Sequence, residues 1–202
     1  MSSWRRVERV GEVAVGGCRA SEVVFCAIDI FMGWRNDDVF DIYETAKDNS
    51  WRFLLGKSGK NMLIVVGLNP STATDTRPDM TLRKIERIAS DNGYDGFVVV
   101  NLCPLRSTII EDLPVEPDAE AHRKNLEVVE AFVRSLQRPC LWAAWSGGIR
   151  AREYLQHARD DLIARLKPYR FRWLRYGPLT KSGHPRHPSR VPYGLVFEPF
   201  TL

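Results

Sequence analysis

The sequence predicts an α/β fold, a three-layer sandwich around a central four-stranded, mainly parallel sheet. From residue 61 onward, short apolar segments alternate with amphipathic helical segments, which is the pattern of right-handed parallel crossovers. Residues of unusual chemistry follow the apolar segments in four loops, and open parallel sheets bind ligands beyond the carboxyl ends of their strands. With 202 residues, 44% of them hydrophobic, the chain is expected to form a single domain.

Each expected element has a local reason. The four expected strands are short apolar runs rich in β-branched or aromatic residues, and they span 62–67, 97–101, 140–145 and 170–176. The expected helices are amphipathic and span 79–93, 118–136 and 148–166. Asp79 is a suitable N-cap for the first helix, and Gly93 is suited to end it. Residues 1–60 are expected to form an extension of strands and loops before a core at 61–202.

The charge distribution is compatible with a polyanionic partner such as DNA. The formal net charge is +4, and from Leu162 to Phe197 every charged residue is Lys or Arg. This stretch therefore has a local positive field. A solvated basic face without a partner would give the same pattern.

The sequence indicates neither a metal site nor a membrane segment. The cysteines form no C-x-x-C pair, and no histidine is spaced to complete a zinc site with Cys18, Cys26, Cys103 or Cys140. There is no apolar run of about 18 residues and no signal-peptide core near the N-terminus. We therefore expect a cytoplasmic monomer without metal, cofactor or membrane association.

The first loop, GLNPSTATDTRPD, follows the expected strand 62–67. Asn69 with Pro70 favours a turn, and such a turn can aim an amide side chain and several backbone N–H groups into a cleft. The loop matches neither G-x-G-x-x-G nor G-x-x-x-x-G-K-[ST], which disfavours dinucleotide and Walker-type phosphate sites. An Asx-turn that binds no ligand is the alternative.

The second and third loops add an amide and two glycines. Asn101 directly follows four apolar strand residues, so its amide is expected to be buried and to need partners. An amide offers a donor and an acceptor at once, which suits the Watson–Crick edge of a base, although a loop-capping Asn would look the same. In WSGG, Gly147 and Gly148 allow close approach of a ligand or simply turn the chain. Trp142 and Trp145 are expected in the core.

The fourth loop, LTKSGHPRHPSR, holds two histidines, each followed by a proline. Pro185 and Pro188 bias His184 and His187 toward extended backbone, which presents both imidazoles. A histidine can donate to a developing anion, and Ser189 with the nearby arginines can bind phosphates. A surface loop with incidental histidines is the alternative.

In this order, the four loops resemble the uracil-DNA glycosylase superfamily. Its members have a G-x-N-P or G-x-D-P loop, a strand ending in a base-reading Asn, an apolar strand ending in W-G or similar, and a late H-P-S loop. This chain supplies GLNPS, VVVN, LWAAWSGG and HPS over residues 62–192. GLNPSTATDT and GHPRHPSRVPY resemble more closely an uncharacterised family of bacterial and phage proteins with N-P-S-T and P-R-H-P signatures.

The resemblance implies catalytic roles for residues of the first and fourth loops. Asn69, which is Asn rather than Asp as in the mismatch-type branch, would position the attacking water. Asp75 and Asp79 lie in the same loop, and either could activate the water instead. His187, the histidine of HPS, would face the leaving base and its developing negative charge.

The resemblance also implies a base pocket and DNA contacts. Asn101 would read the extruded base, and Leu68 and Ser71 would line its pocket. Ser71 stands where uracil enzymes have an aromatic residue that excludes the thymine methyl group, which leaves room beside the C5 edge. Contacts to the DNA backbone are expected from Thr72, Arg77, His184, Arg186, Ser189 and Arg190.

The implied activity is hydrolysis of the N-glycosidic bond of a non-standard pyrimidine flipped out of double- or single-stranded DNA, which leaves an abasic site. A hydroxymethylated or glucosylated cytosine of phage DNA is the favoured substrate, which makes the enzyme antiviral. Uracil or mismatch base-excision repair is the first alternative. A non-catalytic nucleic-acid-binding protein and a small-molecule nucleosidase or deoxyribosyltransferase are the others.

Overall fold

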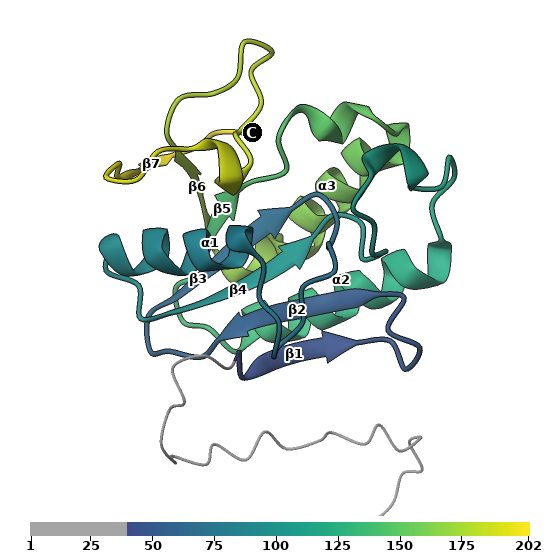
Figure 1. Ribbon diagram of the computed structural model, residues 1–202, viewed down its shortest axis with the longest axis horizontal. Coiled ribbons are helices and arrows are strands. Elements are labelled where there is room, and N and C mark those ends of the chain that lie inside the picture. The colour runs from purple at the N-terminus through teal and green to yellow at the C-terminus, as the bar shows by residue number, and fades with distance from the viewer. Residues whose placement is uncertain (1–39) are drawn as a thin grey trace, which may run out of the picture. The chain divides into compact units, whose positions relative to one another are not determined.

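Seven strands form one sheet within residues 40–202, the part of the chain that the computed structural model describes, in the order β1-β2-β4-β3-β5-β6-β7 (Figure 1). Four of them confirm the predicted strands and run parallel to one another: β3 (Met62–Gly67), β4 (Gly96–Asn101), β5 (Cys140–Ala143) and β6 (Arg172–Tyr176). The predicted total of four strands is wrong, because antiparallel strands extend the sheet at both edges.

Three strands were missed by sequence reasoning as members of the main sheet. β1 (Ile42–Thr45) and β2 (Arg52–Lys57) belong to the predicted extension, and β2 pairs antiparallel with β4. At the other edge β7 (Phe197–Pro199) pairs antiparallel with β6. β7 is short and contains a proline, which only an edge strand tolerates well. Residues 1–39 of the predicted extension, with Cys18 and Cys26, lie outside the described residues.

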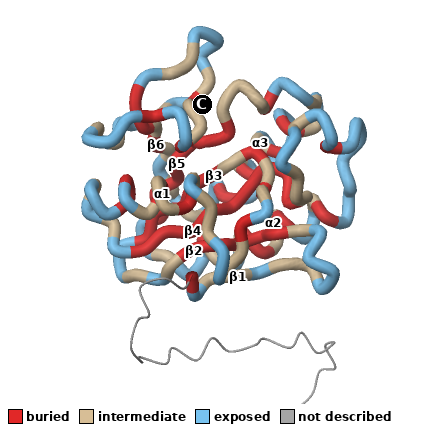
Figure 2. The backbone as a smooth tube through the Cα atoms, viewed as in Figure 1, coloured by how far each residue is buried: buried red, intermediate tan, exposed pale blue. Residues whose placement is uncertain are grey.

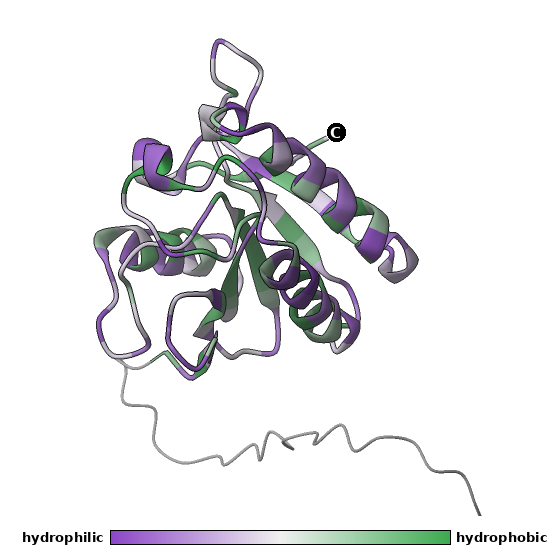
Figure 3. Ribbon diagram, turned by 90° about the vertical axis from the view of Figure 1, so that its right-hand side faces the viewer, coloured by the Kyte–Doolittle hydropathy of each residue, from purple (hydrophilic) through white to green (hydrophobic). Residues whose placement is uncertain are grey.

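Helices cover both faces of the sheet and form the three predicted layers (Figure 1). Because strand side chains alternate between faces, β3 directs Ile64 toward α2 (Ala119–Arg134) and α3 (Glu153–Leu166). It directs Val65 toward α1 (Met80–Asp91) on the other face. Buried residues therefore concentrate in the central strands (Figure 2), which lie as apolar ribbons between helices with polar outer sides (Figure 3).

The helix boundaries confirm one capping prediction and correct one helix start. The Leu82 N–H donates to Asp79 Oδ1 over 2.8 Å, so Asp79 is the N-cap of α1 as predicted. The helix predicted from 148 begins only at Glu153, because 147–150 form a separate 3-10 turn and Arg152 is extended at φ −139°. Because β3, β4 and β5 are parallel, the loops that follow them leave the same end of the sheet, as predicted.

Within residues 40–202, no helix combines the length and apolarity that a membrane crossing requires.

Candidate functional site

A cavity of about 320 Å³ lies at the carboxyl ends of β3 and β4. It sits where ligands bind in open parallel sheets. Its size falls at the lower end of the range for small-molecule sites, roughly 300–1,000 Å³. Six of the predicted site residues line it: Leu68, Asn69, Ser71, Asp79, Asn101 and His187.

The Asn69 amide is held in a fixed orientation by the backbone of the second loop. Its Nδ2 donates to the carbonyl oxygen of Ser107 over 2.8 Å and to that of Pro70 over 3.3 Å. The predicted turn at Asn69-Pro70 therefore also joins the first two loops. Since both donors point to carbonyls, the acceptor Oδ1 is the part of the amide left for a ligand or a water.

Asn101 is buried in the floor of the cavity with an unsatisfied donor. It ends β4, its side chain is only 3% exposed, and its Nδ2 has no hydrogen-bond partner. The backbone is anchored separately, because Asn125 on α2 donates from Nδ2 to the Asn101 carbonyl over 2.8 Å. An unpaired buried donor costs about 1–3 kcal/mol, so this amide is poised for an acceptor on a ligand.

Gly67 leaves the space that the Asn101 amide occupies. The two residues are register partners at the ends of β3 and β4. A Cβ on Gly67 would lie 2.7 Å from Asn101 Oδ1, which is closer than any ordinary contact. Only glycine fits here without moving the amide.

The Gly67→Ala variant is therefore expected to lose ligand binding at the cavity with little loss of fold. The clash falls on the far end of one side chain, so the amide rotates while the strand pairing persists. We expect binding or turnover to fall by about tenfold or more, equivalent to one displaced hydrogen bond. Parallel measurement of the melting temperature checks the fold; a variant with unchanged turnover would contradict this role.

Ser71 and Asp79 form one polar unit at the side of the cavity. Ser71 Oγ donates to Asp79 Oδ2 over 2.7 Å, while Asp79 Oδ1 caps α1. Both carboxylate oxygens thus already accept a hydrogen bond. Asp79 therefore links the first loop to the start of α1.

His187 lines the cavity and uses one of its ring nitrogens in its own loop. The Ser189 N–H donates to Nδ1 over 3.2 Å, and Ser189 Oγ lies 2.7 Å from the same nitrogen. Nδ1 is therefore an acceptor, and in the neutral ring the proton is on Nε2. Burial, with the positive charge of Arg190, lowers the pKa of His187 below its ordinary value, which favours this neutral donor.

Sequence reasoning missed Arg52, which enters the cavity from β2. Its side chain is buried, at 4% exposure, and Nη1 donates to the Ala73 carbonyl over 3.0 Å. Its Nε has no hydrogen-bond partner. Burial, then the nearby Arg106, lowers the pKa of Arg52 to about 10, against the opposing charge of Asp79. An arginine opening the apolar run RFLLGK was the available signal in the sequence.

Ser146 adds backbone strain to the wall of the cavity. It follows β5 at φ +60° and ψ −172°, a conformation that non-glycine residues rarely adopt. Its Oγ accepts from the Gly148 N–H over 3.2 Å, which stabilises the turn. Next to it Trp145 is 1% exposed and packs edge-on against Trp173, so the core assignment of Trp145 is confirmed although it also touches the cavity.

The remaining predicted site residues do not line the cavity. Asp75, the other candidate for water activation, accepts from the Thr76 N–H at Oδ1 and from the Phe40 N–H at its carbonyl. Arg186 donates from Nε to the Pro178 carbonyl, and His184 lies beside Gly147. The full set outside the cavity is Thr72, Asp75, Arg77, His184, Arg186, Ser189 and Arg190.

The basic C-terminal stretch is partly neutralised in the fold. Arg165 pairs with Glu130 over 2.5 Å, and Arg175 pairs with Glu198. Thr72, Arg77 and Arg190 are exposed, as a contact to a phosphate backbone requires.

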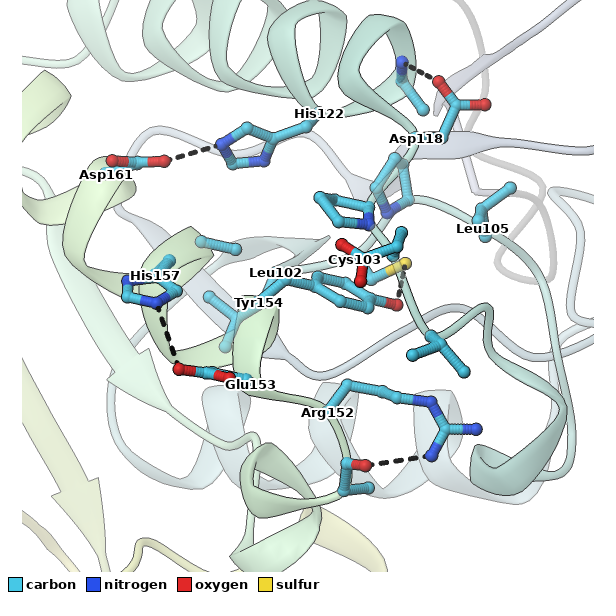
Figure 4. A pocket seen from close by; sticks show the side chains of 17 residues that line it. Leu102, Cys103, Leu105, Asp118, His122, Arg152, Glu153, Tyr154, His157 and Asp161 are labelled. Carbon is cyan, nitrogen blue, oxygen red and sulfur yellow. Dashed lines mark hydrogen bonds and ion pairs between the residues drawn. The ribbon is translucent and has the colours of Figure 1, made fainter.

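A second, larger cavity of about 590 Å³ lies between α2 and α3. Figure 4 shows that its polar side chains already pair with one another: His122 with Asp161 over 2.9 Å, and Tyr154 with Cys103. Within residues 40–202, no buried side-chain atom lacking a partner lines it. The smaller cavity, with two such atoms, is therefore the better candidate for a specific site.

Comparison with known proteins places the chain in one family. No curated protein matches it, and no solved structure matches it. Residues 51–189 match the family described as "Protein of unknown function (DUF1643)", a span that runs from β2 to the HPS motif. Because this match covers more than half of the sequence, the chain belongs to that family.

Proposed function

We propose that the protein is a DNA glycosylase that releases a modified pyrimidine flipped out of DNA. One observation supports this most directly: the Asn101 amide is buried in the floor of a base-sized cavity with an unsatisfied donor. A pyrimidine edge supplies the acceptor that Nδ2 lacks and a donor for Oδ1. The resemblance of the four loops to the uracil-DNA glycosylase superfamily adds to the proposal.

The proposed reaction uses the two loop residues on either side of the base. A water held by Asn69 Oδ1 attacks C1′ of the deoxyribose, and the bond electrons leave with the base. Positive charge builds on the sugar and negative charge on the base, which the His187 Nε2–H stabilises by donating a hydrogen bond. A proton from the water ends on the released base, and an abasic site remains.

The favoured substrate is a cytosine enlarged at C5, such as the hydroxymethylated or glucosylated cytosine of phage DNA. Ser71 is small, and its hydroxyl is held back by Asp79, so the wall expected beside C5 leaves room. Excision of such bases from infecting DNA is an antiviral activity. Extrusion of the base costs a few kcal/mol, which contacts to the phosphates on each side offset.

Replacing Asn101 tests the observation on which the proposal chiefly rests, the buried amide with an unsatisfied donor. Asn101→Ala removes the base-reading amide, and we expect base release to fall ten- to a hundredfold, the value of one or two buried hydrogen bonds. DNA affinity is expected to stay within a few fold, since phosphate contacts supply most of it. Asn125→Ala is the matched control, because it affects only the backbone carbonyl of Asn101 and α2 packing.

The same assay separates the other candidate activities. Abasic sites in uracil-containing duplex alone would replace the favoured substrate by uracil repair. Salt-dependent DNA binding with no released base would indicate a binding protein, whereas release from free nucleosides without DNA binding would indicate a nucleosidase.

A further inference from the structure

The guanidinium of Arg52 is the second unsatisfied donor in the cavity. Among residues 40–202 it makes one side-chain hydrogen bond, from Nη1 to the Ala73 carbonyl, although it is 96% buried. Arginine has five N–H donors and no acceptor, so a buried one needs several oxygen partners. Its Nε has none, although the side chain borders the space that we assign to the base.

Arg52 lines the same cavity as Ser71, the residue that the proposed function places beside C5 of the base. Asp79 attracts Arg52 electrostatically and accepts a hydrogen bond from Ser71 over 2.7 Å. All three residues line the cavity. We define the polar wall as Ser71, Asp79 and Arg52. In the proposed complex this wall would face the one edge of the base that has no other partner.

Only one edge of the flipped pyrimidine is left to face this polar wall. In the proposed function Asn101 takes the Watson–Crick edge and His187 faces the charge that develops on the leaving base. The C5–C6 edge remains, and in cytosine, uracil and thymine it has no hydrogen-bond acceptor. A base with an oxygen on its C5 substituent would supply the acceptor that Arg52 lacks there.

We propose that Arg52 determines substrate choice by donating a hydrogen bond from its guanidinium to an oxygen-bearing substituent at C5 of the flipped pyrimidine. This inference rests on the proposed glycosylase function and adds the residue that distinguishes a modified base from an ordinary one. A site built to bind a polar group discriminates strongly against the analogue lacking it, because its own polar groups are then left unpaired.

Arg106 is a matched control within the chain. Its Nη1 donates to the Ala73 carbonyl over 3.0 Å, as Arg52 does, and to the Ser71 carbonyl over 2.9 Å. It does not line the cavity. Loss of either arginine loosens the first loop, but only loss of Arg52 removes a donor from the proposed site.

The experiment measures release of two bases from otherwise identical synthetic duplexes, one with 5-hydroxymethylcytosine and one with 5-methylcytosine. The bases differ by a single oxygen. We expect the wild-type protein to favour the hydroxylated base by about tenfold or more. In Arg52→Met this preference is expected to disappear, whereas Arg106→Met lowers both rates by a similar factor and keeps their ratio. Equal ratios in both variants would overturn the inference.

Folding of the variants is checked by melting temperature, because Arg52 is buried. Should Arg52→Met not fold, Arg52→Lys is used: an ammonium lacks the planar fork of donors with which a guanidinium spans the Ala73 carbonyl and the substituent, so the ratio is again expected to fall. An unchanged ratio in folded Arg52→Lys overturns the inference while the glycosylase proposal stands. Absence of base release by the wild type from every DNA would overturn both.

Discussion

Replacing Asn69 with alanine is expected to lower the rate of base release by about a hundredfold, the loss that a misplaced reactant can cause, because the amide would position the water without taking its proton. The amide is fixed by its bonds to the Ser107 and Pro70 carbonyls, and only Oδ1 remains to hold the water. DNA affinity is expected to change little, because in the proposed reaction Asn69 holds the water and does not contact the phosphates. Single-turnover release at saturating enzyme measures the effect.

Asp75→Ala is the control for this variant. Asp75 was an alternative for activating the water, and it lies in the same loop but outside the cavity. We expect its loss to leave the rate of release within about threefold, as for surface changes away from the chemistry. A large loss in Asp75→Ala with near-normal release by Asn69→Ala would contradict the proposed water site.

Replacing His187 with alanine is the second change for which we expect a large effect, a loss of release of about a hundredfold to a thousandfold. In the proposed reaction the neutral ring, whose Nδ1 accepts from the Ser189 N–H, donates from Nε2 to the negative charge that develops on the leaving base. His184→Ala, three residues before His187 in the same loop, is expected to lose much less, since His184 does not line the cavity. Equal losses in both variants would instead indicate a general effect of the loop.

The pH profile gives His187 a separate signature. The folded pKa of His187 is lower than the ordinary 6.5, so the ring is neutral at pH 7. As the pH falls through the depressed value, Nδ1 takes a proton and loses the bond from the Ser189 N–H that orients the ring. We expect release to decline on the acid side in wild type and in His184→Ala, and this limb to be absent in His187→Gln. Protonation also requires loss of the Ser189 N–H bond, so stability falls over the same window below pH 6.5.

The parts of the site at strand ends could be predicted from sequence because strand and loop chemistry are local. Asn69, Asn101 and the cap Asp79 each follow an apolar run or precede a helix, and parallel strands bring those ends to one edge. The chain order of the motifs therefore sufficed to predict that Asn69, Asn101 and His187 meet at one cavity.

The parts that depend on long-range contacts could not be predicted. Arg52 reaches the Ala73 carbonyl across 21 residues, and β2 joins the sheet only by antiparallel pairing with β4. Neither the hydrogen bond nor the strand pairing produces a periodic pattern in the sequence. The contact of Ser189 Oγ with His187 Nδ1 depends in the same way on the 3-10 turn Pro188–Arg190. Such contacts become visible only once the fold is known.

The most direct test of the account is the mass of whatever the protein releases from DNA. Purified protein is incubated with duplexes containing cytosine, uracil, 5-hydroxymethylcytosine or its glucosylated form, and the small-molecule fraction is analysed by mass spectrometry while abasic sites are counted. The account predicts free modified cytosine in amounts equal to the abasic sites, and about a hundredfold slower formation of both products by Asn69→Ala. DNA binding by the wild type without any released base from these duplexes would contradict it.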